Sequence, residues 1–248
     1  MPARARTATA MAFRDQLRRP LVLVLLVIVP AYVITRSIAE TLPTPRQIVL
    51  PGEIVVTTTM QDLHGAGMGG LVVAFVVALV GVFVMQSALE GDRRLVLTGF
   101  RPGETVLARL LVLICATALV VAVSVLVTAL NFSAASWPPV IGALVLIGLI
   151  YGAIGGLAGA VLDTLAATYL ILFLVFTDLG VVQNPMFHTT PGRFADLLPG
   201  YGPSRVMYDG AFSAEFHAGS DLLLGLGWLV VLGLAVFFVQ RRAVRAAT

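Results

Sequence analysis

The chain alternates between long apolar runs and shorter polar segments. The apolar runs cover residues 21–34, 70–89, 110–130, 140–162, 165–182 and 222–239. A helix that crosses a bilayer needs about 20 mostly apolar residues. The first run is short and contains Pro30, so we expect Arg18, Arg19 and Arg36 to extend it by reaching toward the headgroups. The pattern predicts an all-α, polytopic membrane protein with six transmembrane helices in a single domain that covers residues 1–248.

The polar segments differ in character. Residues 1–20 are basic and place apolar side chains at helical spacing, which predicts either a helix lying on the membrane surface or a solvated basic tail. Residues 37–66 contain three prolines and polar residues, so we expect a loop. Residues 183–221 form the longest polar segment. Its many apolar and aromatic side chains make it too apolar for a free loop, and a small extracellular lid is one interpretation.

The fourth apolar run carries a face of small residues. Its members are Gly148, Gly152, Gly155, Gly156 and Gly159. Small residues at helix interfaces let two backbones approach closely inside a membrane. We therefore expect another helix to pack directly against this face.

The composition excludes a soluble domain. The chain is 58% hydrophobic and only 12% charged, and its mean hydropathy is +0.97. Soluble domains carry about 25% charged residues. A soluble domain with this composition would not cover its surface with polar groups, whereas a bilayer removes that requirement.

The arginines predict an orientation, because Arg-rich segments stay on the cytoplasmic side of a membrane. With the N-terminus inside and the runs alternating, 12 of the 16 arginines lie inside. These are Arg4, Arg6, Arg14, Arg18, Arg19, Arg93, Arg94, Arg101, Arg109, Arg241, Arg242 and Arg245. The sequence thus predicts a multi-pass protein of the cytoplasmic membrane with both termini in the cytoplasm.

All sixteen basic residues are arginine, and this excludes one class of nucleotide site. A Walker A loop needs a lysine that reaches the β- and γ-phosphates. Residues 65–70 do match the dinucleotide pattern GxGxxG, with Glu90 twenty residues further on. However, an uncharged span would separate these glycines from Glu90, so we interpret them as a flexible start of the second span.

Residues 87–109, between the second and third runs, combine charge with apolar groups. Charged residues open the segment, Leu95, Val96 and Leu97 follow, and a turn at Gly99 to Pro102 precedes a second short helix. Exposed apolar groups rimmed by charge usually mark a docking surface. The alternative is that these side chains tuck against the bilayer.

This segment resembles the coupling region of permease subunits of ABC-2 type exporters. The matching residues are Glu90-Gly91, Leu95, Thr98, Glu104 and Arg109, and the chain departs from the family at Gly99, where the family usually has proline. The six-run topology, the basic N-terminal segment and the long segment before the last run fit the same family, which includes daunorubicin- and fluoroquinolone-type drug exporters.

The resemblance implies a partner. Two such permeases, identical or paired with a paralogue, would bind two cytoplasmic ATPase subunits that carry ATP and Mg²⁺, so this chain would bind no cofactor and have no ATPase site of its own. Residues 183–221 would form short re-entrant helices before the last span. The implied ATPase-coupling interface is Glu90, Gly91, Arg94, Leu95, Leu97, Thr98, Phe100, Glu104 and Arg109.

Asp178 is the one charged residue that the sequence places inside an apolar run, about four residues from its outer end. Such a group marks a functional site by default, although Asp178 is close enough to the outer end to reach the headgroups. We consider Tyr169, Thr177, Asp178 and Gln183 as a candidate translocation path. His64, His188 and His217 fall outside the membrane without the tight spacing of a metal site.

These patterns favour one function over two others. The favoured one is the membrane subunit of an ATP-driven exporter of a hydrophobic or amphipathic small molecule, such as a drug, antibiotic or lipid. An ATP-independent carrier or channel would need charged groups or broken helices near the midplane. A membrane enzyme or assembly factor would need clustered catalytic residues, and we predict no catalytic residues, no metal site and no nucleic-acid partner.

Overall fold

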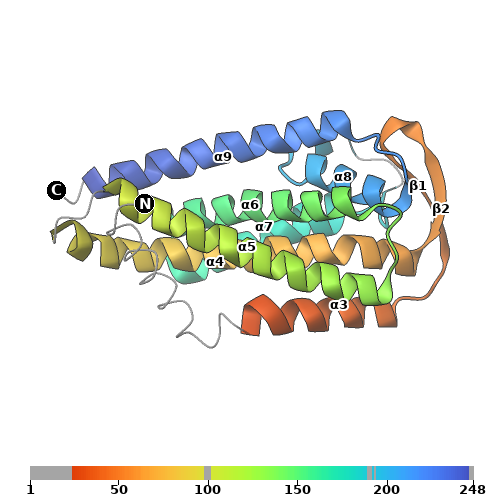
Figure 1. The fold of residues 1–248 in the computed structure, drawn as a ribbon, viewed down its shortest axis with the longest axis horizontal. Helices are drawn as coiled ribbons and strands as arrows, with labels where there is room; N and C mark the ends of the chain where they lie inside the picture. The colour runs from red at the N-terminus through yellow and green to blue at the C-terminus, as the bar shows by residue number, and fades with distance from the viewer. Residues whose placement is uncertain (1–23, 98–101, 189–191, 193, 246–248) are drawn as a thin grey trace.

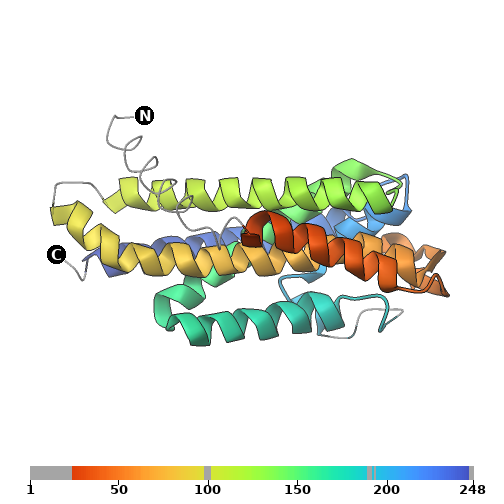
Figure 2. The ribbon, with the colours of Figure 1, turned by 90° about the horizontal axis from the view of Figure 1, so that it is seen from below.

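The computed structural model describes residues 24–97, 102–188, 192 and 194–245 as an elongated bundle of helices (Figures 1 and 2). The long helices are α4 (Met60–Leu97), α5 (Pro102–Asn131), α6 (Trp137–Val161) and α9 (Gly219–Arg245). Helix α7 (Thr164–Val175) continues directly into the π-helical segment η3 (Phe176–Val182). The shorter elements are η1 (Val24–Ile28), α3 (Val29–Glu40), β1 (Pro45–Val49), η2 (Pro51–Glu53), β2 (Val55–Thr59), η4 (Ala195–Leu197) and α8 (Tyr201–Phe212).

Five of the described helices are long and apolar enough to cross a membrane. The spans are Met60–Gln86, Arg109–Asn131, Trp137–Val161, Thr164–Val182 and Gly219–Gln240. Four of them start and end within three residues of the predicted runs. The chain is therefore plausibly a multi-pass membrane protein, and these five spans account for all but the first predicted run.

The helix in the region of the first predicted span has different ends from those predicted. The described helix runs from Val24 through η1 and α3 to Glu40, well past the predicted end at Ile34. With 17 described residues, this helix is too short to be counted as a membrane span. The predicted total of six transmembrane helices is therefore not confirmed. The predicted surface helix at residues 1–20 lies outside the described residues.

Residues 37–66, predicted as a loop, are almost entirely ordered into regular structure. Strands β1 and β2 pair antiparallel, from Pro45 opposite Thr59 to Val49 opposite Val55. The run Val55–Thr59 consists of β-branched residues, which favour strands. At the turn Gly52 has φ of 75°, a conformation that glycine adopts without strain. The prediction of an all-α fold is thus wrong here.

Helix α4 begins ten residues before the predicted start at Gly70. The Thr59 hydroxyl accepts a hydrogen bond from the Asp62 backbone N–H at 3.1 Å and donates to the Asp62 carboxylate at 2.7 Å. This cap satisfies a backbone donor at the helix N-terminus. The first turn of α4 contains polar residues, so the hydropathy pattern places the start of the helix too late in the sequence.

The glycines of the GxGxxG match consequently lie inside a helix and do not form a flexible start. A Cβ on Gly65 would lie 2.9 Å from Phe132, one on Gly67 would overlap the Tyr208 hydroxyl, and one on Gly70 would lie 3.1 Å from Met207. Phe132 follows α5, and the other two side chains belong to α8. The motif therefore allows close packing at the start of α4.

The predicted small-residue face of α6 is confirmed as the contact with α4, which is the most extensive helix contact in the bundle. A Cβ on Gly155 would overlap the carbonyl oxygen of Ala78, and one on Gly159 would lie 2.7 Å from that of Val82. From the other side, a Cβ on Gly81 would overlap the α6 backbone at Gly152. We call this contact the glycine seam.

The bundle has two distinct ends (Figure 1). The hairpin end holds β1 and β2, the end of α3 and the starts of α4, α6 and α9. The α4–α5 end holds Leu97, Pro102 and the C-terminal part of α9. As expected, short helices precede the last span: η4 and the mostly buried α8, which packs against α6 and α9 at the hairpin end.

We predict that Gly155→Ala lowers the free energy of unfolding by about 1–3 kcal/mol, because the added methyl group has no space in the glycine seam. The control is Gly142→Ala on the same helix, where an added Cβ has no neighbour within 4 Å. Thermal melting of both variants in detergent measures the difference. Equal melting temperatures for the two variants would contradict the seam.

Candidate functional site

A buried carboxylate organises the junction between α6, η3 and the start of α8. Asp178 is only 2% exposed. Its Oδ2 accepts hydrogen bonds from the Tyr151 hydroxyl and from the Gly200 backbone N–H, the latter at 3.0 Å. Its Oδ1 accepts from Gln183 Nε2 at 3.1 Å. These partners provide the hydrogen bonds that a buried carboxylate requires.

The π-helical geometry of η3 accompanies the inward position of Asp178. The Gln183 backbone N–H donates to the Asp178 carbonyl oxygen at 2.8 Å, a bond that spans five residues instead of four. Single π turns inside longer helices occur frequently at functional sites. Here the wider turn carries both Asp178 and Gln183 into one hydrogen-bonded cluster.

The cluster also fixes the chain that leads to α8. Gln183 Nε2 donates a second hydrogen bond, to the Ala195 carbonyl oxygen at 3.0 Å. A Cβ on Gly200 would lie 2.7 Å from the Tyr151 hydroxyl and 2.9 Å from Asp178 Oδ1, so this position has space only for glycine. The arrangement joins three separate parts of the chain at one carboxylate.

The structure separates the members of the candidate translocation path. It brings Asp178 and Gln183 together, but Tyr169 is 63% exposed on α7 and Thr177 is half-buried. The interpretation of Asp178 as a headgroup anchor is wrong, because its side chain is buried among protein groups. Its main partner, Tyr151, was not singled out in the sequence because an isolated tyrosine in an apolar run carries no local signal.

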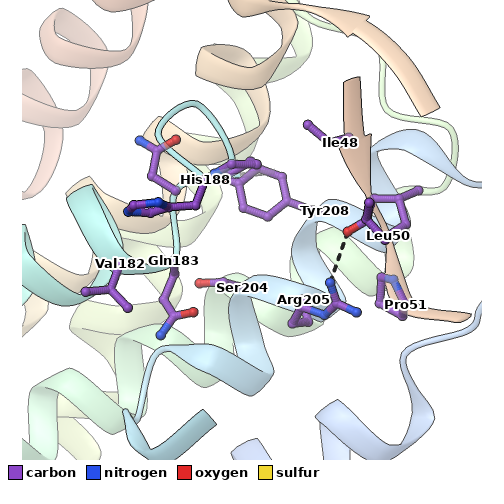
Figure 3. Close-up of a pocket in the computed structure, with 12 residues that line it drawn as sticks. Ile48, Leu50, Pro51, Val182, Gln183, His188, Ser204, Arg205 and Tyr208 are labelled. Carbon is purple, nitrogen blue, oxygen red and sulfur yellow. Dashed lines mark hydrogen bonds between the residues drawn. The ribbon is translucent and has the colours of Figure 1, made fainter. Parts of the chain in front are cut away.

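A second polar network holds the hairpin against α8 and α9. Arg205 Nη1 donates to the Val49 carbonyl oxygen at 3.0 Å (Figure 3), and Arg205 Nε lies 3.8 Å from Asp221 Oδ2. The adjacent cavity, lined by Gln183, His188 and Arg205 among others, has a volume of about 30 Å³. A cavity of this size holds about one water molecule and no larger ligand.

Asp209 connects α8 to the start of α9. It is fully buried, and its Oδ2 accepts hydrogen bonds from the backbone N–H groups of His217 at 2.7 Å and Ala218 at 3.1 Å. The His217 ring lies 3.5 Å from the same carboxylate. Among the described residues, no group of three or more His, Cys, Asp or Glu side chains lies close enough to hold a metal ion.

The predicted coupling residues lie at the α4–α5 end. Glu90, Gly91, Arg94, Leu95 and Leu97 fall on the last turns of α4, which stays helical where a loop was predicted. The predicted second short helix is the first part of α5, so Glu104 and Arg109 belong to that long helix. Thr98 and Phe100 lie outside the described residues.

We predict that Tyr151→Phe destabilises the protein by about 1–3 kcal/mol, because it leaves the buried Asp178 carboxylate without one of its donors. Tyr169→Phe is the matched control, since Tyr169 is mostly exposed. Thermal melting in detergent compares the two variants. A Tyr151→Phe protein that melts like Tyr169→Phe would show that the cluster contributes nothing to stability.

Comparison with known proteins gives no family assignment. A scan against protein-family models found no match, and a search of curated proteins found no significantly similar sequence. The five candidate spans indicate a multi-pass membrane protein, and buried polar groups hold its hairpin end together.

Proposed function

We propose that this chain is the transmembrane permease subunit of an ATP-driven exporter of the ABC-2 type. The observation that carries the proposal is the sequence of residues 87–109 together with its position at one end of the bundle. Of the residues that resemble the family's coupling region, those that the structure describes lie on α4 and α5, outside the apolar runs 70–89 and 110–130.

Two helices extend past their apolar runs at this position. Beyond the end of the run 70–89, α4 continues for eight residues to Leu97, or about 12 Å at ~1.5 Å per residue. Helix α5 starts at Pro102, eight residues before its apolar run 110–130 begins. Such an extension would give a cytoplasmic ATPase a firm surface to press on.

A force applied to the end of α4 would be transmitted along this helix into the bundle. Helix α4 is one continuous helix of 38 residues that runs from the α4–α5 end to the hairpin end (Figure 2). The glycine seam joins it backbone to backbone with α6. A push on the end of α4 would therefore tilt α4 and α6 as a unit.

The energy source would be a separate subunit. Because the chain has no lysine, it has no Walker A loop, and ATP and Mg²⁺ would bind to two copies of a partner ATPase. A second permease, either another copy or a paralogue, would complete the exporter. The distribution of arginines supports a cytoplasmic location of the α4–α5 end.

The cargo is best matched by a hydrophobic or amphipathic small molecule. The apolar runs 70–89, 110–130, 140–162, 165–182 and 222–239 contain one charged residue, the buried Asp178. Apolar walls of this kind suit a drug, an antibiotic or a lipid better than an inorganic ion.

We predict that the tagged protein, extracted in mild detergent from its own host, captures an ATPase subunit with measurable ATP hydrolysis. Leu97→Asp should abolish the capture, because a charge would disrupt an apolar docking surface. Leu42→Asp is the control, since Leu42 is 74% exposed and lies at the hairpin end.

Two results would contradict this function. One is the absence of any captured ATPase together with normal transport by the Leu97→Asp protein. The other is substrate flux in sealed vesicles that follows an ion gradient and needs no ATP, which would favour the carrier or channel.

A further inference from the structure

An apolar cavity of about 230 Å³ lies between α4, α5, α6 and α9. It lies in the half of the bundle near the α4–α5 end and is separate from the Asp178 cluster. For comparison, a cavity of ~150 Å³ in another protein is large enough to bind benzene. The volume is below the ~300–1,000 Å³ of pockets that enclose a drug-sized ligand.

Each of the four helices contributes one face to this cavity. On α9 the lining residues are Leu229, Gly233, Val236 and Gln240, which follow helical spacing over eleven residues, or about 16 Å. This length is close to half of a hydrocarbon core of ~30 Å. The lining residues of α9 therefore extend over about the thickness of one membrane leaflet, and all of them except Gln240 are apolar.

Among the described residues that line the cavity, the polar side chains are Arg109 and Gln240, and both lie at the α4–α5 end. Arg109 directly precedes the apolar run 110–130 and Gln240 directly follows the run 222–239, so both lie next to charged segments of the sequence. The Gln240 side chain is 7% exposed, and its Oε1 has no hydrogen-bond partner. Buried acceptors of this kind are normally satisfied.

The cavity is also accessible from the side. Leu110 and Ile114 of α5 line it and are 40% and 50% exposed. On the opposite wall, an added Cβ on Gly233 would meet no atom within 4 Å. Helices α5 and α9 make little contact with each other, so a molecule in the bilayer has a lateral route between them.

We propose that this cavity binds one acyl chain of an anionic phospholipid that carries a hydroxyl group in its headgroup. The chain occupies the apolar wall from Val236 to Leu229. The permanently positive Arg109 attracts the phosphate, and a headgroup hydroxyl donates a hydrogen bond to Gln240 Oε1. The lipid comes from the leaflet at the α4–α5 end, and its second chain stays in the bilayer.

The proposal does not depend on the exporter function. It requires only that the bundle spans a membrane, and lipid binding is measured without any ATPase. Failure to capture an ATPase would therefore leave this site intact, and failure to bind lipid would leave the exporter intact.

The test is native mass spectrometry of the full-length protein in detergent, titrated separately with phosphatidylglycerol, phosphatidylcholine and palmitate. We expect the wild type to retain one phosphatidylglycerol in preference to the other two. Gly233→Leu should weaken that binding by about tenfold or more, because its side chain fills the cavity. Gly227→Leu is the matched control, since Gly227 is also unobstructed, lies on α9 and is not part of the lining.

A second variant makes the test independent of steric effects. Gln240→Leu should weaken phosphatidylglycerol binding about fivefold through the lost hydrogen bond and leave phosphatidylcholine binding unchanged. Melting temperatures establish that each variant is folded. Equal binding by the Gly233→Leu and Gly227→Leu proteins, no effect of Gln240→Leu, or a preference of the wild type for phosphatidylcholine or palmitate would overturn the proposal.

Discussion

The close approach of α4 and α6 is the constraint on which the remaining structure depends. Lipid tails are as apolar as leucine side chains, so burial of apolar surface does not drive helices together in a bilayer. Backbone contact at Gly81, Gly155 and Gly159 supplies dense van der Waals packing instead. Helices α3, α5 and α7 then pack on α4, and α8 and α9 pack on α6, so the seam forms the centre of the bundle.

The two ends of the bundle are stabilised in different ways. At the hairpin end, the carboxylates of Asp178 and Asp209 and the guanidinium of Arg205 connect α6, η3, β1, α8 and α9 through short-range hydrogen bonds. Burial raises the pKa of the nearby Tyr208 phenol, so its hydroxyl stays protonated where it packs against Gly67. At the α4–α5 end, an apolar cavity separates α5 from α9. Under the proposed function, this asymmetry would confine motion mainly to the end where an ATPase binds.

The glycines of residues 65–70 illustrate how one motif supports different structures. A dinucleotide site needs them in a loop between a strand and a helix. Here the Thr59 cap starts α4 earlier, and Gly65 and Gly70 leave space for the side chains of Phe132 and Met207. The local pattern is the same in both cases, and only the surrounding elements distinguish them.

The sequence by itself determined the membrane class, five apolar spans, four of them to within three residues, and the glycine face of α6, because each of these depends on composition or spacing along one helix. It did not locate the hairpin, because the three prolines and the polar residues of residues 37–66 favour a loop. Only the tertiary structure decided the environment of Asp178, because its partners Tyr151 and Gly200 lie more than 20 residues away in the chain. The same holds for the cavity, because its four walls come from four helices whose spacing no single stretch of sequence specifies.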